Sequence, residues 1–182
     1  MQKPMRPTLP EERAVLHVRA GKLLKGLLTD FTPTADTVHL QSETEPGKAP
    51  IEVKVADLKA IYYVRSLTGN KQYKKKRYFG SVSEDRALPV RARGLGASED
   101  PVLSHPHGPQ NPINTKGKRI MVRFKDGEIL CGFIDGELPW KDGFLTATDP
   151  NLKGFFIYPA DPAGNNTKVF VVTTAVEDVR RL

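Results

Sequence analysis

The chain has 182 residues, a net charge of +7 and a single cysteine, Cys131. These values exclude an internal disulfide and a metal site of four cysteines, and no apolar run approaches the roughly 18 residues of a membrane span. Prolines and charges occupy the N-terminal residues where a signal peptide needs an apolar run, so we expect a cytoplasmic protein with no membrane contact, long enough for two small domains.

The first predicted domain covers residues 12–66. In "AVLHVRAGKLLKGLL", apolar residues on both sides of Gly21 predict two strands around a tight turn, and Gly26 lies inside the outgoing strand. A glycine at that place favours a bend or a close approach between backbones. The alternating runs "DTVHLQS" and "PIEVKV" predict the third and fourth strands, and "ADLKAIYYV" predicts the closing strand.

Residues 67–116 are predicted to form a basic, Pro/Gly-rich and largely irregular connector. Between Ser66 and Arg119 there are 11 Lys and Arg residues against 4 acids, so the whole excess of positive charge lies between these two residues, mostly in the connector. The histidines of "SHPHGP", His105 and His107, have no cysteine or carboxylate cluster beside them and are more typical of a proline-rich loop than of a metal site. We expect no metal and no cofactor.

The run "KQYKKKRYF" in this connector combines positive charges with aromatic rings. Such charges neutralise phosphates and such rings stack on bases, which makes the run a candidate nucleic-acid contact. The other interpretation is a solvated linker whose aromatic residues dock onto the first domain. The candidate contacts are Lys74, Lys75, Lys76, Arg77, Tyr78 and Phe79.

The second predicted domain covers residues 117–182 and repeats the first. At an offset of 106 residues, Gly127 matches Gly21 and Gly132 matches Gly26. "DGFLTAT" predicts the third strand, "KVFVVTT" the fourth and "TAVEDVRRL" the closing strand, now at an offset of 118. The change of offset predicts a 12-residue insertion within residues 149–168.

Two residues of the second domain carry separate expectations. Cys131 lies in an apolar strand and is predicted to be a buried thiol that reacts slowly with a thiol reagent. Trp140 is the only tryptophan and stands in the loop "ELPWKDGF". It either covers the core or forms the exposed anchor of a protein-binding surface, because loop aromatics serve both purposes.

Five short strands in about 60 residues, with a turn before the last, are typical of a small closed barrel. The fold class is therefore predicted as all-β, with two tandem small SH3-like or Sm-like five-stranded barrels joined by the connector. "VRFKDGEILCGFI" resembles the first Sm motif, and "IEVKVADLKAIYYVRSLTGN" resembles the closing segment of a family of uncharacterised bacterial Sm-like or SH3-like domains. In Sm proteins an Asp, an Asn and an Arg-Gly pair form the uridine site. Only the Asp has counterparts here, Asp30 and Asp135, so the resemblance implies the fold without that RNA site.

The sequence contains no recognisable set of nucleophile, base and orienting group, and no pair of carboxylates at a defined spacing. We therefore predict that the protein is not an enzyme. The leading hypothesis is an adaptor or regulatory module that engages another macromolecule, with a protein partner and Trp140 as candidate anchor. The alternative is binding of RNA or single-stranded DNA through the basic connector.

Overall fold

The computed structural model describes residues 12–45, 47–70, 72–73, 79, 117–135 and 151–182. The described residues of the first copy form β1 (Glu12–Val18), β2 (Leu23–Leu28), β3 (Thr37–Gln41), β4 (Ile51–Lys54), the 3-10 helix η1 (Val55–Asp57) and β5 (Leu58–Val64). Those of the second copy form β6 (Lys118–Phe124), β7 (Ile129–Ile134), β8 (Gly154–Pro159), β9 (Asn166–Val172), η2 (Thr173–Ala175) and β10 (Val176–Arg181). The prediction of an all-β protein is confirmed, and no described helix has the length and apolar character needed to cross a membrane.

The two tight turns predicted from glycine are equivalent. Gly21 and Gly127 have φ angles of 81° and 83°, in the left-handed region that glycine adopts without strain. The amide of Val18 donates to the carbonyl of Lys22 over 2.9 Å, and the amide of Phe124 donates to Glu128 over the same distance. The repeat seen in the sequence is therefore a repeat of local structure.

The two strand glycines lie where the third strand of each copy crosses the second closely. A Cβ atom at Gly26 would stand 2.3 Å from the carbonyl oxygen of Gln41, and one at Gly132 would stand 2.3 Å from that of Tyr158. No side chain fits at such a distance. The prediction that these glycines permit close approach is confirmed.

The third strand of the second copy was predicted at the wrong place. The predicted segment, residues 142–148, lies outside the described residues, and the strand that pairs with β7 is β8. The β2–β3 connection spans residues 29–36, whereas β7–β8 spans residues 135–153, so the extra length precedes β8 instead of falling within residues 149–168. The physical reason is burial: Phe155 and Ile157 of β8 fill the core while β8 pairs along β9.

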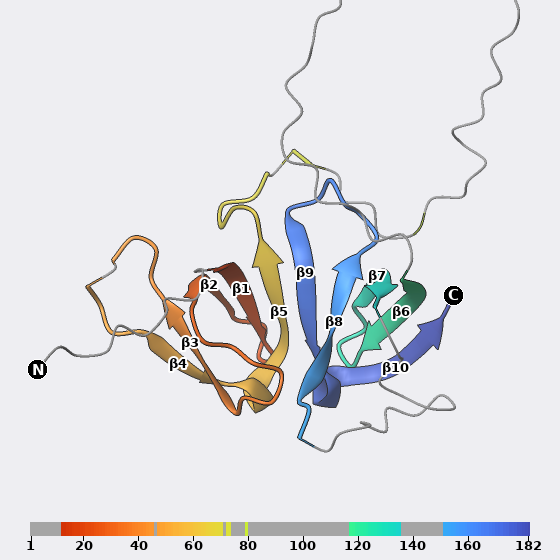
Figure 1. Cartoon of the computed structure of the whole chain (residues 1–182), viewed down its shortest axis with the longest axis horizontal. Helices are drawn as coiled ribbons and strands as arrows, with labels where there is room; N and C mark the ends of the chain where they lie inside the picture. The colour runs from red at the N-terminus through yellow and green to blue at the C-terminus, as the bar shows by residue number, and fades with distance from the viewer. Residues whose placement is uncertain (1–11, 46, 71, 74–78, 80–116, 136–150) are drawn as a thin grey trace, which may run out of the picture.

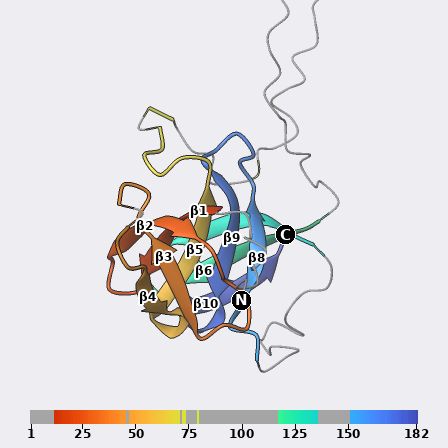
Figure 2. The ribbon, with the colours of Figure 1, turned by 60° about the vertical axis from the view of Figure 1, so that its left-hand side comes forward.

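All described strands belong to one open antiparallel sheet (Figure 1), in the order β10-β6-β7-β8-β9-β5-β1-β2-β3-β4. Each copy contributes five adjacent strands in the same internal order, with the fifth strand beside the first. The prediction of two separate barrels is not confirmed, because β5 of the first copy pairs directly with β9 of the second. Figures 1 and 2 show these two strands side by side at the centre of the molecule.

Two hydrophobic cores lie on opposite faces of this central pair of strands. Phe170 and Val172 of β9 pack in the core of the first copy, while Tyr62 and Val64 of β5 pack in the core of the second. Every residue of β5 is buried as a result. Each core is thus completed by side chains from the other copy.

Cys131 is 4% exposed, which confirms that the thiol is buried. Burial raises its pKa, because a thiolate loses hydration in an apolar environment. A raised pKa lowers the fraction of reactive thiolate at neutral pH. Slow reaction with a thiol reagent stays a prediction.

Candidate functional site

The zone of contact between the copies, here called the seam, is the feature that neither copy has alone. At its centre β5 pairs with β9 over the register from Ala60 opposite Val171 to Val64 opposite Asn166. Polar side chains bridge the copies around this pairing, and aromatic rings from both copies meet beside it. The seam therefore contains polar and aromatic contacts that neither copy could form alone.

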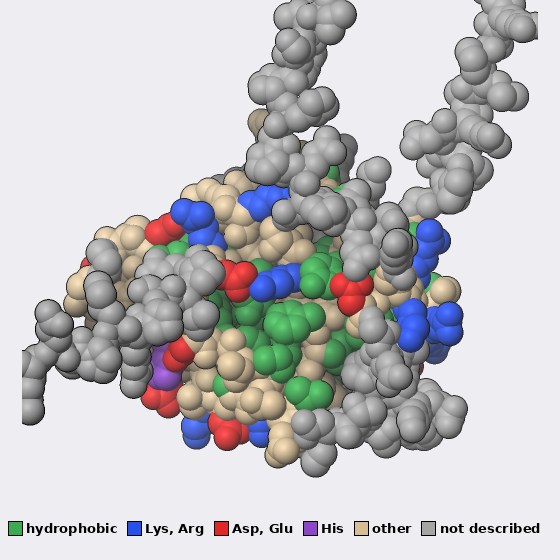
Figure 3. All heavy atoms as spheres, in the orientation of Figure 1, with side chains coloured by type: hydrophobic (Ala, Val, Ile, Leu, Met, Phe, Trp, Pro, Cys, Tyr) green, Lys and Arg blue, Asp and Glu red, His purple; other side chains and the backbone are tan. Residues whose placement is uncertain are grey.

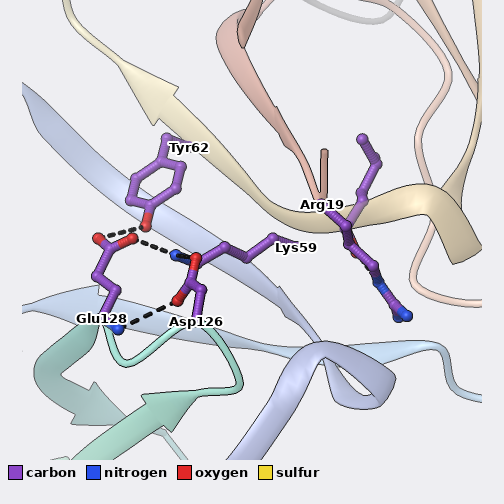
Figure 4. Close-up of polar contacts among 6 residues, drawn as sticks. Arg19, Lys59, Tyr62, Asp126 and Glu128 are labelled. Carbon is purple, nitrogen blue, oxygen red and sulfur yellow. Dashed lines mark hydrogen bonds and ion pairs between the residues drawn. The ribbon is translucent and has the colours of Figure 1, made fainter. Parts of the chain in front are cut away.

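A buried cation holds the turn of the second copy against the first (Figure 4). Lys59 of β5 is 7% exposed, and its Nζ donates to Asp126 Oδ2 over 2.5 Å and to Glu128 Oε2. The same Nζ lies 4.5 Å from the centre of the Phe124 ring. The hydroxyl of Tyr62 donates to Glu128 Oε1 over 3.4 Å. We call Lys59, Tyr62, Asp126 and Glu128 the Lys59 cluster.

A β-bulge directs Lys59 toward the second copy. In the pairing of β1 with β5, His17 lies opposite Ala60 and Val18 lies opposite Leu58, so Lys59 is the extra residue. A bulge interrupts the alternation of a strand and can re-aim one side chain. This explains how a lysine within the apolar run "LKAIYYV" finds charged partners.

The electrostatics of the cluster follow from this geometry. The hydrogen bond from Lys59 is the main reason why the pKa of Asp126 lies below its ordinary value. Burial raises the pKa of Tyr62, and the negative charge of Glu128 raises it further, so this phenol stays protonated as a donor. Because its charged groups are bonded to one another, the cluster acts as an inter-copy lock.

Replacing Lys59 with Met should lower the free energy of unfolding at neutral pH by about 1 kcal/mol, because Met keeps the buried stem but donates no hydrogen bonds to the two carboxylates. The folded-state pKa of Asp126 lies below the ordinary value of 3.8. The stability that ionised Asp126 contributes is therefore present above pH 3.8 and is lost as the pH falls through the folded-state pKa. In urea unfolding followed from about pH 5 to about pH 2, the variant should lose less stability than the wild type.

Lys48→Met is the matched control for this prediction. Lys48 pairs with Glu45 at the surface, where the side chains are 69% and 59% exposed, so its loss should stay within about 0.5 kcal/mol. Two results would contradict the assignment of Lys59 as a lock. One is an equal loss of unfolding free energy for the two variants; the other is an equal fall of that free energy with acidification for Lys59→Met and the wild type.

Aromatic residues from both copies meet at a second part of the seam. The rings of Phe31 and Phe156 lie edge-to-face against the buried ring of Phe170, with centroids 4.7 and 5.2 Å away. Lys168 Nζ stands 4.2 Å above the ring of Tyr63 and 5.6 Å from that of Phe156, and it also pairs with Glu12. Phe31 and Phe156 are half-buried, so part of each ring faces solvent. We call Phe31, Phe156, Lys168 and Glu12 the aromatic face.

Figure 3 shows hydrophobic side chains gathered in the middle of one side of the molecule, with basic and acidic side chains beside them. At the edge of the aromatic face, Lys153 Nζ lies 2.9 Å from Asp36 Oδ1, and the Lys153 amide donates to the carbonyl of Pro33 over 3.0 Å. These contacts also join the two copies. The result is an apolar centre bordered by paired charges.

Arginines tie the copies together at two further places. The Arg19 side chain, which lies apart from the Lys59 cluster in Figure 4, donates to the carbonyl of Leu58 over 3.3 Å and to the hydroxyl of Thr174. Arg65 donates to the carbonyls of Pro162, over 2.9 Å, and Gly164. The bond of Arg19 to Thr174 and those of Arg65 join the two copies, whereas the bond to Leu58 holds the Arg19 side chain within the first copy.

Most of the residues singled out in the sequence fall outside the described residues, namely Lys74, Lys75, Lys76, Arg77, Tyr78, His105, His107 and Trp140. Phe79 is described: its ring packs edge-to-face on Phe133, with centroids 5.0 Å apart, and Arg119 lies 5.2 Å from its centroid. The Tyr73 hydroxyl donates to the buried carboxylate of Asp161 over 2.8 Å. Both rings that border the basic run thus contact the second copy, not the first as the linker interpretation supposed.

The seam residues were missed in the sequence, although two weak signals for the Lys59 cluster were present. A single Lys interrupts the apolar run of β5, and two acids flank Gly127 in the turn "KDGE". Neither signal indicates that the two segments meet. Among the described residues, no three His, Cys, Asp or Glu side chains are grouped to hold a metal ion.

Comparison with known protein families finds a match to both copies. A model of a family of unknown function, DUF6982, matches residues 10–93 and residues 104–182. One matched region contains the first copy and the other contains the second, consistent with a tandem duplication of one domain. No curated protein and no solved structure matches the chain significantly.

Proposed function

We propose a binding function for this chain, which belongs to the family of unknown function DUF6982. The function is that of a non-enzymatic module that captures another protein on the aromatic face. The observation that carries the proposal is the set of partly exposed rings from both copies, Phe31 and Phe156, held on the buried ring of Phe170. Duplication serves this function because the face exists only where the copies meet.

The aromatic face has the layout of a protein-binding surface. Aromatic residues are enriched in the centres of protein interfaces, and polar residues are enriched at their rims. Here the ion pairs Lys168–Glu12 and Lys153–Asp36 border the rings. Rings fixed by their neighbours lose little conformational entropy on binding, so they are suited to serve as anchors. The partner that fits is a protein with an apolar anchor and charges of both signs around it.

We also propose that each half of the sheet is an SH3-like or Sm-like unit. Two features support this: the order β5-β1-β2-β3-β4, which the second copy repeats as β10-β6-β7-β8-β9, and the 3-10 helix before each fifth strand. The halves would then be small barrels fused through β5 and β9, with binding at their junction and not in either unit.

The test is a pull-down from a native lysate with tagged wild type, Phe31→Ala and Phe156→Ala, each with and without nuclease. The wild type should capture a protein whose binding persists after nuclease treatment, and neither variant should capture it. In calorimetry the purified partner should bind the wild type and not the variants. Leu23→Ala is the control, because Leu23 is 51% exposed but contributes to none of the seam contacts above. A captured protein that both variants retain would refute the aromatic face as the binding surface.

Binding of RNA or single-stranded DNA through the basic run is the second candidate. It is supported by the concentration of all the excess positive charge between Ser66 and Arg119. Replacing Lys74, Lys75, Lys76 and Arg77 with Ala should then flatten the salt dependence of filter binding by about 0.7 log unit for each single-strand phosphate that is no longer neutralised. Capture that nuclease abolishes, together with such a flattening, would favour this candidate over protein binding.

A further inference from the structure

The sheet ends in two strands of different kinds. No described strand pairs with the outer side of β4, the fourth strand of the first copy, or with that of β10, the fifth strand of the second copy. They lie toward opposite sides of the molecule in Figure 1. At the seam, a fifth strand of one copy, β5, pairs with a fourth strand of the other, β9. The two free edges are therefore the same two kinds of strand that already pair inside the chain.

The repeat predicts the register in which such edges would meet. Ile61 lies opposite Leu16 in the first copy, and Val179 lies opposite Val122 in the second, so β10 matches β5 at the offset of 118. In the same way, Val53 lies opposite Val38 and Val171 lies opposite Phe155, so β9 matches β4 at the offset of 118. Transferred to the free edges, the seam register sets Asp178 opposite Val53, Val179 opposite Glu52 and Arg180 opposite Ile51.

The bulge that forms the lock is also repeated. Val176 lies opposite Phe124 and Asp178 lies opposite Arg123, so Glu177 is the extra residue in β10, just as Lys59 is in β5. Glu177 is exposed. The partner of Lys59 in the turn of the second copy is Glu128, and the equivalent residue in the turn of the first copy is Lys22, which is also exposed. The equivalent of the Lys59–Glu128 pair is therefore Glu177 with Lys22, in which the acidic and the basic residue have exchanged places.

Other charges along the two edges are complementary in the same register. The acidic end of β10, at Glu177, meets Lys54 of β4, and at the basic end Arg181 lies diagonal to Glu52 on the same face of the sheet. Opposite charges on neighbouring strands stabilise a pairing, whereas like charges oppose it. Charges can also protect an edge strand from pairing, but that role would not require the charges of β10 and β4 to be opposite in one particular register.

We propose that the chain associates head-to-tail with a second copy of itself, with β10 of one molecule pairing antiparallel with β4 of the next and Glu177 contacting Lys22. A contact between two different edges is heterologous, so it extends into a ring or a filament. The joint is weaker than the seam, since Glu52 replaces Phe170 and Arg180 replaces Tyr62. Pro50 stands where Lys168 stands in β9 and has no N–H, which limits the pairing to Ile51–Lys54. The proposal does not depend on the aromatic face.

The test measures the mass of the full-length chain by sedimentation velocity over a concentration series at low and high salt. Wild type should gain mass with concentration and lose it with salt. Glu177→Lys and Lys22→Glu each place like charges at the joint, and each should weaken association at least tenfold. The double variant restores an opposite pair and should recover most of the association that each single variant loses, with Lys54 still opposing the new lysine. An equimolar mixture of the two single variants should associate beyond dimers in alternating order, because both joints between unlike molecules carry opposite charges and only those between like molecules repel.

Folding does not confound this test, because Glu177 and Lys22 are exposed and the four proteins should share one unfolding midpoint. A wild type that stays monomeric throughout would overturn the proposal, as would single variants that associate normally. A second measurement addresses the register: Arg180→Cys mixed with Ile51→Cys should form a disulfide-linked heterodimer under mild oxidation. If Arg180→Cys links mainly to itself, the contact is isologous and the head-to-tail proposal is wrong.

Discussion

Replacing Phe170 with Ala should lower the free energy of unfolding by about 3–5 kcal/mol, the usual loss when a buried aromatic ring is removed. Phe170 is fully buried, belongs to β9 of the second copy and packs in the core of the first. Its ring also supports Phe31 and Phe156 at the seam. One substitution in the second copy should therefore weaken both copies.

Urea unfolding by far-UV circular dichroism measures the loss, and hydrogen exchange shows where it acts. The slow amides of β1 and β5 in the first copy should lose protection together with those of β9. Tyr158→Ala serves as the control, because Tyr158 is 39% exposed on the neighbouring strand β8 and its loss should cost less than about 1 kcal/mol. Two separate unfolding transitions, with the first copy unaffected by Phe170→Ala, would show that the copies are independent domains.

Replacing Gly132 with Ala should cost about 3 kcal/mol, at the upper end of what an inserted methyl group costs in a packed interior. The added Cβ would lie 2.3 Å from the carbonyl oxygen of Tyr158 and 2.3 Å from Ile157 Cγ2. Backbone cannot give way there without disturbing the pairing of β7 with β8. The thermal unfolding midpoint should fall accordingly, with the slow amides of β7 and β8 most affected.

Two further variants, Gly26→Ala and Gly47→Ala, serve as comparison and control for this prediction. Gly26 is the equivalent glycine of the first copy, with the Gln41 carbonyl oxygen at 2.3 Å from the added atom, and its replacement should cost a similar amount. Gly47 has no atom within 4 Å of an added Cβ, so its replacement should change the stability by less than about 0.5 kcal/mol. If Gly132→Ala is as harmless as Gly47→Ala, the close crossing of β8 over β7 is not present in solution.

Local chemistry was enough to predict the repeated elements. Gly21 and Gly127 mark equivalent turns because few residues other than glycine adopt a positive φ at low cost. The spacing from each turn to Gly26 or Gly132, and the alternation of β3 and β4, follow from contacts between residues close in sequence. The same features allowed five strands with a turn before the last to be predicted for each copy.

The third strand of the second copy was assigned wrongly for a reason that lies in pairing. Residues 142–148 and residues 154–159 are both apolar runs after a loop, and local propensity does not distinguish them. The strand that pairs with both β7 and β9 is β8. That choice depends on which run can bury Phe155 and Ile157 within a core already bounded by other strands.

The sequence by itself determined the duplication, the turns and most of the strands, because each depends on neighbours a few residues away. Only the tertiary structure decided how the copies join. The continuous apolar runs of β5 and β9 indicate burial on both faces but do not say against what. Lys59 meets Glu128 from 69 residues away, and Ile61 lies opposite Phe170. Contacts at such separations depend on which edges meet in the folded chain, and no periodicity within a short window carries that information.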